Sequence, residues 1–376
     1  MTILLLALAG LVGLDSILSE RDTFSRRASS RVRQLIPKPP PAPPGREELR
    51  ESESQRVAAL KLEDPGKQET FVYAREKDAW RCLSRFRAIA DEGKIKSLID
   101  KLLSTQGIVQ LREVAQVPDY GLGEKSVLRL SLHGPRVFQE SGEDLLHSFD
   151  VGFSTPGGAG CYVRLSGGME VIAIDSNLRD ELARPELAGI PPLVDPHIIP
   201  PVGLGNMGVQ RIVVDRADGE KFELLRREKK ISPEEMKAGQ LPWDWILKKN
   251  DREETCPPGT SNAFANFLLR APFLAILDPK ILPQLGLDKP SSKLSLYSAE
   301  AKPAEGKPVE GKPVEVVIGR KGVNGRVPVR NELTQGLFEA ASEVADLLAP
   351  RAEQLTLGPN QAEATQENPW QSFLRR

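Results

Sequence analysis

The spacing most suggestive of chemistry is in the glycines of residues 203–208. This stretch, GLGNMG, satisfies the G-x-G-x-x-G pattern that can hold the pyrophosphate of a dinucleotide. Such a site needs a strand before the glycines and a helix N-terminus after them. Here the glycines follow Pro200 and Pro201 and lead into the strand-like run VQRIVVD. We therefore interpret them as part of an interdomain linker and expect no nucleotide cofactor.

A second stretch, residues 154–160 (STPGGAG), could cradle a phosphate, but no Lys-Ser or Lys-Thr pair follows it as a P-loop requires. β-type residues flank it on both sides, which indicates a hairpin tip. Acidic clusters such as Glu51 with Glu53 and Glu234 with Glu235 could supply a general acid or base. They lie among other charges and without the signal of an apolar pocket, so we expect them on the solvated surface.

The cysteines and histidines show no spacing typical of a metal centre or a disulfide framework. The cysteines are odd in number and lack a C-x-x-C pair, and the histidines lack an H-E-x-x-H pattern. The sequence therefore predicts no metal, no cofactor and no identifiable catalytic residue. The cysteines and histidines in question are Cys82, Cys161, Cys256, His133, His147 and His197.

Chain length and charge limit the number of domains and the classes of partner. The chain has 376 residues, which is enough for two domains of ordinary size. Its 51 Lys and Arg residues nearly balance its 52 Asp and Glu residues, which leaves a net charge of −1. No excess of positive charge indicates a nucleic-acid partner.

Residues 1–20 begin with an uncharged apolar run from Thr2 to Leu14. A membrane-spanning helix needs about 20 apolar residues, so we expect a single N-terminal transmembrane helix that anchors the chain in the cell membrane. A cleaved signal peptide fits less well, because no basic residues precede the run and no A-x-A-like site follows it. Arginines between residues 21 and 33 favour a cytoplasmic body by the positive-inside rule.

Stretches rich in proline or glycine separate the expected folded parts. Residues 21–56 form a basic and proline-rich linker, in which residues 37–44 (PKPPPAPP) should be an extended spacer. Residues 185–208 separate two similar halves. Residues 302–315 duplicate the pentapeptide GKPVE, in what we expect to be a long hairpin loop.

The two halves, residues 57–184 and 209–350, can be aligned residue by residue. In each half, four apolar residues with i, i+1, i+4, i+5 spacing indicate one face of a helix. Asp91 in the first half and Thr260 or Ser261 in the second are candidate N-caps. Adding 165 to a residue number carries Trp80 to Trp245, Leu98 to Ala263, Ile99 to Phe264, Leu102 to Phe267, Leu103 to Leu268, Gly121 to Gly286 and Leu122 to Leu287.

The pattern of both halves indicates the same order of elements. This order is a hairpin, a tryptophan, an amphipathic helix, a short strand, a Gly-Leu turn, further strands and a short closing helix. The expected fold class is α+β, with two tandem repeats behind the membrane helix. Each repeat should be a mostly antiparallel sheet with a packed helix. We expect residues 351–376 to form a flexible C-terminal tail.

Trp243 and Trp245 could stack on a ligand. Because Trp245 has a counterpart at Trp80, we expect it in the core of its repeat. Trp243 has no counterpart and could reach a partner surface. Large aromatic side chains are seldom left exposed, so a core position is favoured for it as well.

This order of elements resembles a bacterial family known as domain of unknown function 4340. The motifs that carry the resemblance are Trp80, Trp245 and two turns, residues 120–122 (YGL) and 285–290 (LGLDKP). The first turn lacks the proline of the second, and the basic residues after Trp80 depart from the family pattern. The resemblance covers residues 57–350. The resemblance implies two tandem copies of the domain and no assigned reaction. Members of the family are often found beside components of gliding-motility-type ABC transport systems. This implies that the body lies on the extracytoplasmic side of the membrane.

Two functions from different classes are compatible with these features. We favour a membrane-anchored, non-catalytic binding or scaffold protein that contacts membrane lipid through its N-terminal helix. Its protein partner, by the family resemblance, would be a component of an ABC-type transport system. The alternative is an enzyme whose site lies between the repeats, built from residues that no local motif reveals. The arginines and the resemblance favour opposite sides of the membrane, with the extracytoplasmic side slightly preferred.

Overall fold

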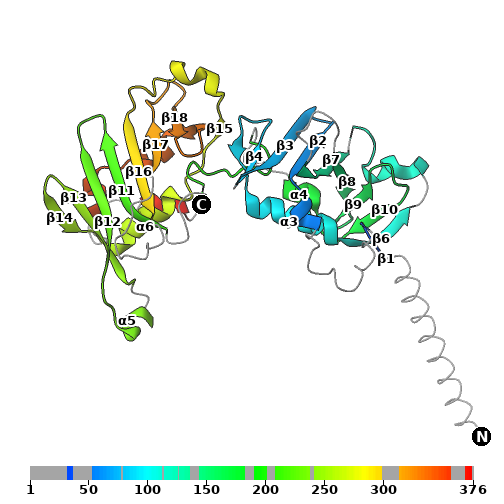
Figure 1. The fold of residues 1–376 in the computed structure, drawn as a ribbon, viewed down its shortest axis with the longest axis horizontal. Helices are drawn as coiled ribbons and strands as arrows, with labels where there is room; N and C mark the ends of the chain where they lie inside the picture. Colours follow the sequence, from blue (N-terminus) through cyan, green and yellow to red (C-terminus); the bar gives the residue numbers. More distant parts are fainter. Residues whose placement is uncertain are drawn as a thin grey trace, which may run out of the picture. The chain divides into compact units, whose positions relative to one another are not determined.

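The computed structural model divides the chain into two compact units. The first comprises Met1–Trp80 with Asp91–Pro185, and the second comprises Arg81–Ala90 with Glu186–Arg376. Figure 1 shows their strands and helices. The residues that the structure describes are 32–36, 53–77, 79–111, 114–125, 127–135, 144–182, 190–200, 208–237, 241–298, 313–356 and 369–374.

In the part of the chain that the structure describes, the first sheet has ten strands and is largely antiparallel. In chain order they are β1 (Val32–Gln34), β2 (Ala59–Asp64), β3 (Glu69–Glu76), β4 (Ala79–Cys82), β5 (Ala88–Ile89), β6 (Gln106–Leu111), β7 (Leu128–His133), β8 (Leu145–Ser154), β9 (Cys161–Leu165) and β10 (Val171–Ile174). Across the sheet the order is β1-β6-β10-β9-β8-β7-β2-β3-β4-β5. Alternate side chains such as Leu60 and Leu62 are buried, since successive residues of a strand point to opposite faces.

The main helix of the first unit, α3 (Glu92–Ser104), begins where the sequence predicts. The Asp91 side chain accepts a hydrogen bond from the Lys94 backbone N–H at 3.0 Å, which makes Asp91 the N-cap. Leu98, Ile99 and Leu102 on one side of the helix are buried, as their spacing indicates. The shorter helices of this unit are α2 (Glu53–Arg56), η2 (Val114–Tyr120) and α4 (Leu178–Leu182).

In the described residues the second sheet has nine strands, and neighbouring strands pair antiparallel. They are β11 (Val209–Arg216), β12 (Lys221–Glu228), β13 (Trp243–Lys249), β14 (Arg252–Thr255), β15 (Ala275–Ile276), β16 (Ser292–Ser298), β17 (Val314–Ile318), β18 (Arg326–Asn331) and β19 (Gly336–Ala341). The helices of this unit are α5 (Pro233–Lys237), α6 (Pro258–Leu268), η5 (Pro279–Gln284), α7 (Ser342–Leu348), α8 (Ala352–Thr356) and α10 (Pro369–Leu374). Strands predominate over helices in both units, within a broadly α+β fold.

The two sheets have the same order of strands. The second runs β14-β13-β12-β11-β16-β17-β18-β19-β15, which corresponds strand for strand to the first from β5 to β6. Trp80 and Trp245 are buried in the corresponding strands β4 and β13. Gly121 and Gly286 follow η2 and η5 with φ angles of 74° and 63°, a backbone conformation that favours glycine.

Helix α6 begins earlier than the sequence predicts. Its N-cap is Pro257, whereas Thr260 and Ser261 lie inside the helix and are buried. The Ser261 hydroxyl donates to the Pro257 carbonyl at 2.9 Å. A proline at the start of a helix costs little, because the first N–H groups have no partner within the helix.

Part of the stretch expected to be a linker between the halves belongs to the core of the second unit. Ile198 and Ile199 are fully buried. The Ile198 N–H donates to the Ala271 carbonyl, and its carbonyl accepts from the Asn331 side chain, both at 2.9 Å. An apolar pair between prolines has no periodicity, so the sequence carries no signal of this burial.

Residues 32–34, expected in the basic linker, instead form strand β1. This strand pairs with β6, and the next residues, Leu35 and Ile36, are buried. A strand this short has too few residues for alternation to be recognised in the sequence. The sheet therefore includes a segment that the sequence places outside the folded units.

The C-terminal segment also differs from the flexible tail expected from the sequence. Helix α8 buries Ala352 and Leu355, and helix α10 buries Trp370. Two aromatic rings of α10 pack against rings of α6. These helices are only five and six residues long, and such short segments are stable only through tertiary packing.

Other sequence features lie outside the residues that the structure describes. They include the expected membrane helix at residues 1–20, the spacer at residues 37–44 and glycines 203 and 205. Among the described residues, no helix combines the length and apolarity needed to cross a membrane. Gly208 is described, and β11 begins directly after it, so a strand stands where a dinucleotide site requires a helix. Strands β16 and β17, on either side of the expected long hairpin loop, pair with each other, and Val314 and Glu315 belong to β17.

Glu220 connects the turn between β11 and β12 to β13 and α8. Its Oε1 accepts hydrogen bonds from Lys249 Nζ at 2.5 Å and from the Ala352 backbone N–H at 3.3 Å. Burial raises the pKa of this carboxyl. The bonds from Lys249 and Ala352 and the charges of Lys249 and Arg216 outweigh that effect and hold the pKa below its usual range.

We expect Glu220→Gln to destabilise the second unit by about 1–3 kcal/mol at pH 7, the usual value of charge-assisted hydrogen bonds. A lowered folded-state pKa means that this stabilisation is present above the unfolded-state pKa and is lost as pH falls through the folded-state pKa. Denaturant unfolding should therefore show the two chains converging as pH falls below about 4.5. A constant difference down to pH 3 would contradict the linkage, and Glu343→Gln, at an exposed position of α7, is a suitable control.

Candidate ligand-binding groove

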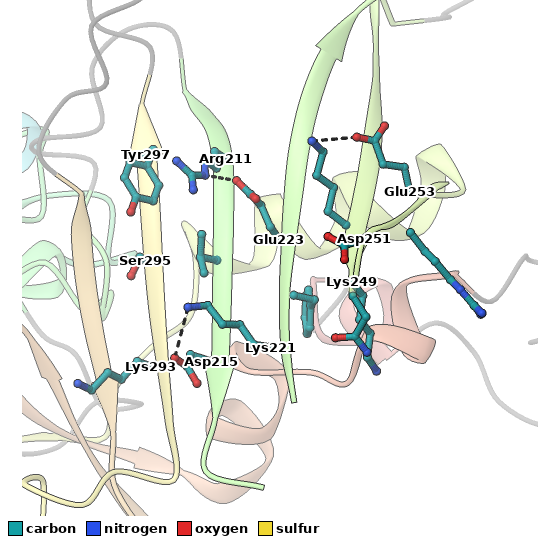
Figure 2. Close-up of a pocket in the computed structure, with 15 residues that line it drawn as sticks. Arg211, Asp215, Lys221, Glu223, Lys249, Asp251, Glu253, Lys293, Ser295 and Tyr297 are labelled. Carbon is teal, nitrogen blue, oxygen red and sulfur yellow. Dashed lines mark ion pairs between the residues drawn. The ribbon is translucent and has the colours of Figure 1, made fainter. Parts of the chain in front are cut away.

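The open face of the second sheet contains a groove with a volume of about 710 Å³. Strands β11, β12, β13 and β16 form its floor, and the loop after β13 contributes to its wall (Figure 2). Alternate side chains of each strand point to this face, while the opposite set packs into the core. In β11, for example, Arg211 and Asp215 line the groove, whereas Ile212 and Val214 are fully buried.

Ion pairs join neighbouring strands across the groove floor. Arg211 on β11 pairs with Glu223 on β12. Lys221 Nζ lies 3.9 Å from an Asp215 carboxylate oxygen, and Lys248 Nζ lies 2.8 Å from a Glu253 carboxylate oxygen. Figure 2 shows these pairs along the face. Opposite charges on adjacent strands stabilise a sheet modestly and fix the direction of the side chains.

One side of the groove combines an aromatic ring with cations. The Arg211 guanidinium lies 4.6 Å from the centroid of the Tyr297 ring, a cation–π distance. Lys293 and Ser295 line the groove on the same strand as Tyr297. Among the described residues, no ion pair is formed by Lys293. This side therefore presents an ammonium group, a hydroxyl and a ring to any ligand.

Three of the four carboxylates that line the groove are held by neighbouring cations. Hydrogen bonds from Lys248 and Arg227 hold the pKa of Glu253 below its usual range. A carboxyl of this kind is a weak general acid near neutral pH. Asp215 and Glu223 are also engaged in ion pairs. Charged groups with an adjacent ring and hydroxyl can instead hold the backbone and side chains of an extended polar ligand.

Sequence reasoning assigned no site residues and did not identify the groove. Its side chains come from five strands spread between residues 211 and 297. The only local signal is the alternation of charged and apolar residues in VQRIVVDR and KFELLRRE. That pattern is equally typical of any strand with one solvated face, so only pairing of the strands brings the groove residues together.

The corresponding face of the first sheet neutralises its own charges. Asp150 on β8 is only 1% exposed and lies between Arg129 and Arg164 in the register of β7, β8 and β9. Its carboxylate accepts from Arg129 Nε at 3.1 Å and from Arg164 Nε at 2.9 Å. The Ser166 hydroxyl donates to the same carboxylate at 2.8 Å.

In the second sheet Val317 occupies the place of Asp150. Val317 lies opposite Lys293 on one side and Arg330 on the other, the same strand positions as Arg129 and Arg164. Arg330 pairs with Glu332 at 3.0 Å instead. The two sheets thus share a topology but differ in the charge pattern of their open faces.

Comparison with known proteins places the chain in a family. Residues 80–290 match a domain of unknown function (DUF4340), and this match covers more than half of the chain. The chain belongs to the DUF4340 family. The matched segment of this DUF4340 protein runs as one piece from Trp80 to the end of the LGLDKP turn and includes parts of both units. No curated protein matches the chain, and no solved structure matches it.

A His–Asp contact in this DUF4340 protein resembles part of a catalytic triad. His197 Nδ1 lies 2.6 Å from Asp195 Oδ1, and the His197 backbone N–H donates to the same oxygen at 2.9 Å. The contact is therefore a local turn that an Asp two residues before its partner commonly forms. No hydrogen bond joins His197 to a serine, threonine or cysteine side chain in the described part of the chain, so the arrangement lacks a nucleophile.

A smaller hollow of about 260 Å³ lies in the first unit of this DUF4340 protein. Its apolar side includes Trp80 and Ile99, and its polar side includes Arg75, Glu92 and Lys96. Trp80, which we expected in the core of its repeat, thus forms part of the wall of this hollow. Trp245 is buried, and its Nε1–H donates to Asn262 Oδ1 at 2.9 Å.

Two other features that the sequence singled out, the glycine-rich stretch and Trp243, have structural roles in the described part of the chain. Residues 155–160 form the turn between β8 and β9, with Gly157 and Gly158 at φ angles of 93° and 76°. The Arg226 guanidinium covers the half-buried ring of Trp243 at 3.5 Å from its centroid. No group of three or more His, Cys, Asp or Glu side chains in the described residues could hold a metal.

The cysteines of this DUF4340 protein are free and buried. Burial raises the pKa of the Cys82 and Cys161 thiols, and burial together with Glu254 raises that of Cys256 to about 11. Each thiol is therefore protonated at neutral pH and shielded from reagents. A buried thiol of this kind is inert compared with a catalytic cysteine.

We expect iodoacetamide at pH 7.5 to leave all these thiols unmodified in the folded protein and to alkylate them in denaturant. The folded rate should be at least about 100-fold slower, because reaction requires both exposure and a thiolate. Intact-mass measurement over time would report each added group. Rapid alkylation of one cysteine in the folded chain would contradict this view and identify a reactive thiol.

Proposed function

We propose that this protein is a membrane-anchored, non-catalytic binding protein that holds an extended polar segment of a partner on the open face of its second sheet. The observation that carries the proposal is the groove of about 710 Å³ with ion-paired side chains on four strands. Arg211, Tyr297 and Lys293 would contact the partner. The groove carboxylates other than Asp251 are engaged in ion pairs, which supports binding rather than acid–base chemistry.

We further propose that the two units are tandem copies of one domain. The common strand order of the two sheets supports this. So do the paired positions of Trp80 with Trp245 and of Gly121 with Gly286. In this proposal the copies have diverged on their open faces, and only the second retains a groove for a partner.

The proposed partner is a component of an ABC-type transport system, an expectation that rests on the family resemblance. Residues 1–20 would anchor the chain in the cell membrane, with the body on the extracytoplasmic side. Protease accessibility in intact cells tests the orientation, since a cytoplasmic body would be protected. Degradation only after lysis would overturn this part of the proposal.

Charge reversal in the groove tests the binding function. A chain with Arg211→Glu and Lys293→Glu should lose at least about tenfold in affinity for its partner, equivalent to about 1.4 kcal/mol. Lys321→Glu, on the exposed loop between β17 and β18, is the matched control and should bind normally. The measurement is purification from native membranes with quantification of transporter subunits, followed by binding to the purified subunit. Equal recovery with both variants would exclude the groove as the binding site.

A further inference from the structure

The C-terminal helix α10 of the second unit fills an apolar seat on helix α6. Trp370 is 1% exposed, and its ring lies 5.5 Å from that of Phe264 between centroids. One turn later, the Phe373 ring meets Phe267 edge to face at 5.1 Å. Residues three apart lie on the same side of a helix, so a Trp-x-x-Phe pattern is what the seat accepts.

A polar contact fixes the depth of the tryptophan. Its Nε1–H donates to the Leu347 carbonyl at 3.2 Å. Leu347 is in the last turn of α7, where carbonyl groups have no partner within the helix. The seat therefore has two rings on α6 for apolar contact and one carbonyl on α7 that accepts the indole proton.

The seated helix is short and joined to the body by a long connection. Helix α10 has six residues, too few to be helical without its seat. Twelve residues separate Thr356 at the end of α8 from Pro369. A connection of this length can reach at most about 40 Å, which is far enough to serve a neighbouring molecule as well as its own.

We propose that the α6–α7 seat is a docking site for a Trp-x-x-Phe helix, and that a second copy of this chain can supply it by exchange of C-terminal segments. The contacts would be those already seen within one chain, because an exchanged segment meets the same surface. In cis, the covalent connection gives α10 a high effective concentration at its own seat. Pairing therefore becomes favourable when copies are concentrated, as the proposed N-terminal membrane anchor would bring about.

The first test uses the full chain in detergent and a labelled peptide of residues 366–376. Trp370→Ala breaks the resident segment and leaves the seat intact. By fluorescence anisotropy, the peptide should bind this chain at least about tenfold more tightly than it binds the wild type, whose seat is occupied. A peptide with the same Trp370→Ala change should not bind. Absence of binding to the folded variant would overturn the docking site.

Two further chains control for general destabilisation. Phe273→Ala removes a buried ring that stacks on Phe338 elsewhere in this unit. It should lower stability without creating peptide binding, and binding there would overturn a specific seat. If Trp370→Ala fails to fold by circular dichroism, Phe373→Ala replaces it, because Phe373 is only half-buried.

The second test decides whether a second copy is the occupant. Phe264→Ala damages the seat but keeps an intact C-terminal segment, so it complements Trp370→Ala. Size-exclusion chromatography with light scattering should show a 1:1 pair in the mixture and monomers for each chain alone. Excess peptide should dissolve the pair. Peptide binding without a mixed pair would overturn the second copy as the occupant.

Discussion

Replacing Asp150 with alanine is expected to destabilise the first unit by about 3 kcal/mol. The change leaves Arg129 and Arg164 without their shared carboxylate and removes the acceptor of the Ser166 hydroxyl. Breaking a buried ion pair by removing one partner costs about 3–5 kcal/mol. We expect the lower end, because the Arg129 side chain is 41% exposed and can be hydrated.

Hydrogen exchange measured by mass spectrometry can resolve this effect within the chain. Amides of β7, β8 and β9 should lose protection in Asp150→Ala, while amides of β16, β17 and β18 should not. Asp175→Ala, at an exposed position after β10, is the control and should change stability by less than about 0.5 kcal/mol. Equal protection in Asp150→Ala and the wild type would show that the carboxylate contributes little.

Replacing Trp245 with alanine should destabilise the second unit by about 4 kcal/mol. Its ring is buried, and its indole N–H donates to Asn262 on α6. Truncating a buried aromatic ring costs about 3–5 kcal/mol through lost burial and the remaining cavity. The Asn262 side chain would also lose its hydrogen-bond donor. Denaturant unfolding followed by circular dichroism would measure the change.

Trp243→Ala is the matched control, since it removes the same ring two residues earlier on β13. Trp243 is half-buried and covered by the Arg226 guanidinium. Partly exposed cation–π contacts contribute about 0.5–1 kcal/mol, so we expect a loss near 1 kcal/mol. A loss in Trp243→Ala equal to that in Trp245→Ala would contradict the distinction between a core ring and a peripheral one.

The sequence determined the local elements of the fold. Asp91 begins α3 because an Asp side chain can accept from the first free N–H groups of a helix. Gly121 and Gly286 mark turns because other residues rarely adopt their positive φ angles. The common offset between the halves pairs Trp80 with Trp245 on corresponding strands. These signals were readable because each depends on a few neighbouring residues.

The sequence could not determine which distant residues meet. The groove side chains alternate with core residues on four strands, and nothing in one strand specifies its neighbour. Trp370 follows a long polar stretch, so its burial against Phe264 has no local signal. Likewise, Asp150 is one charge among many until β7 and β9 place arginines on both sides.

The sequence by itself therefore determined the order of elements, the tryptophan correspondence and the family. The tertiary structure decided the open-face groove, the buried carboxylate of the first sheet and the seat of the C-terminal helix. The physical reason is the range of the interactions. Helix capping, turn conformation and side-chain alternation act within a few residues, whereas ion pairs and aromatic contacts between strands and helices exist only after the chain has folded.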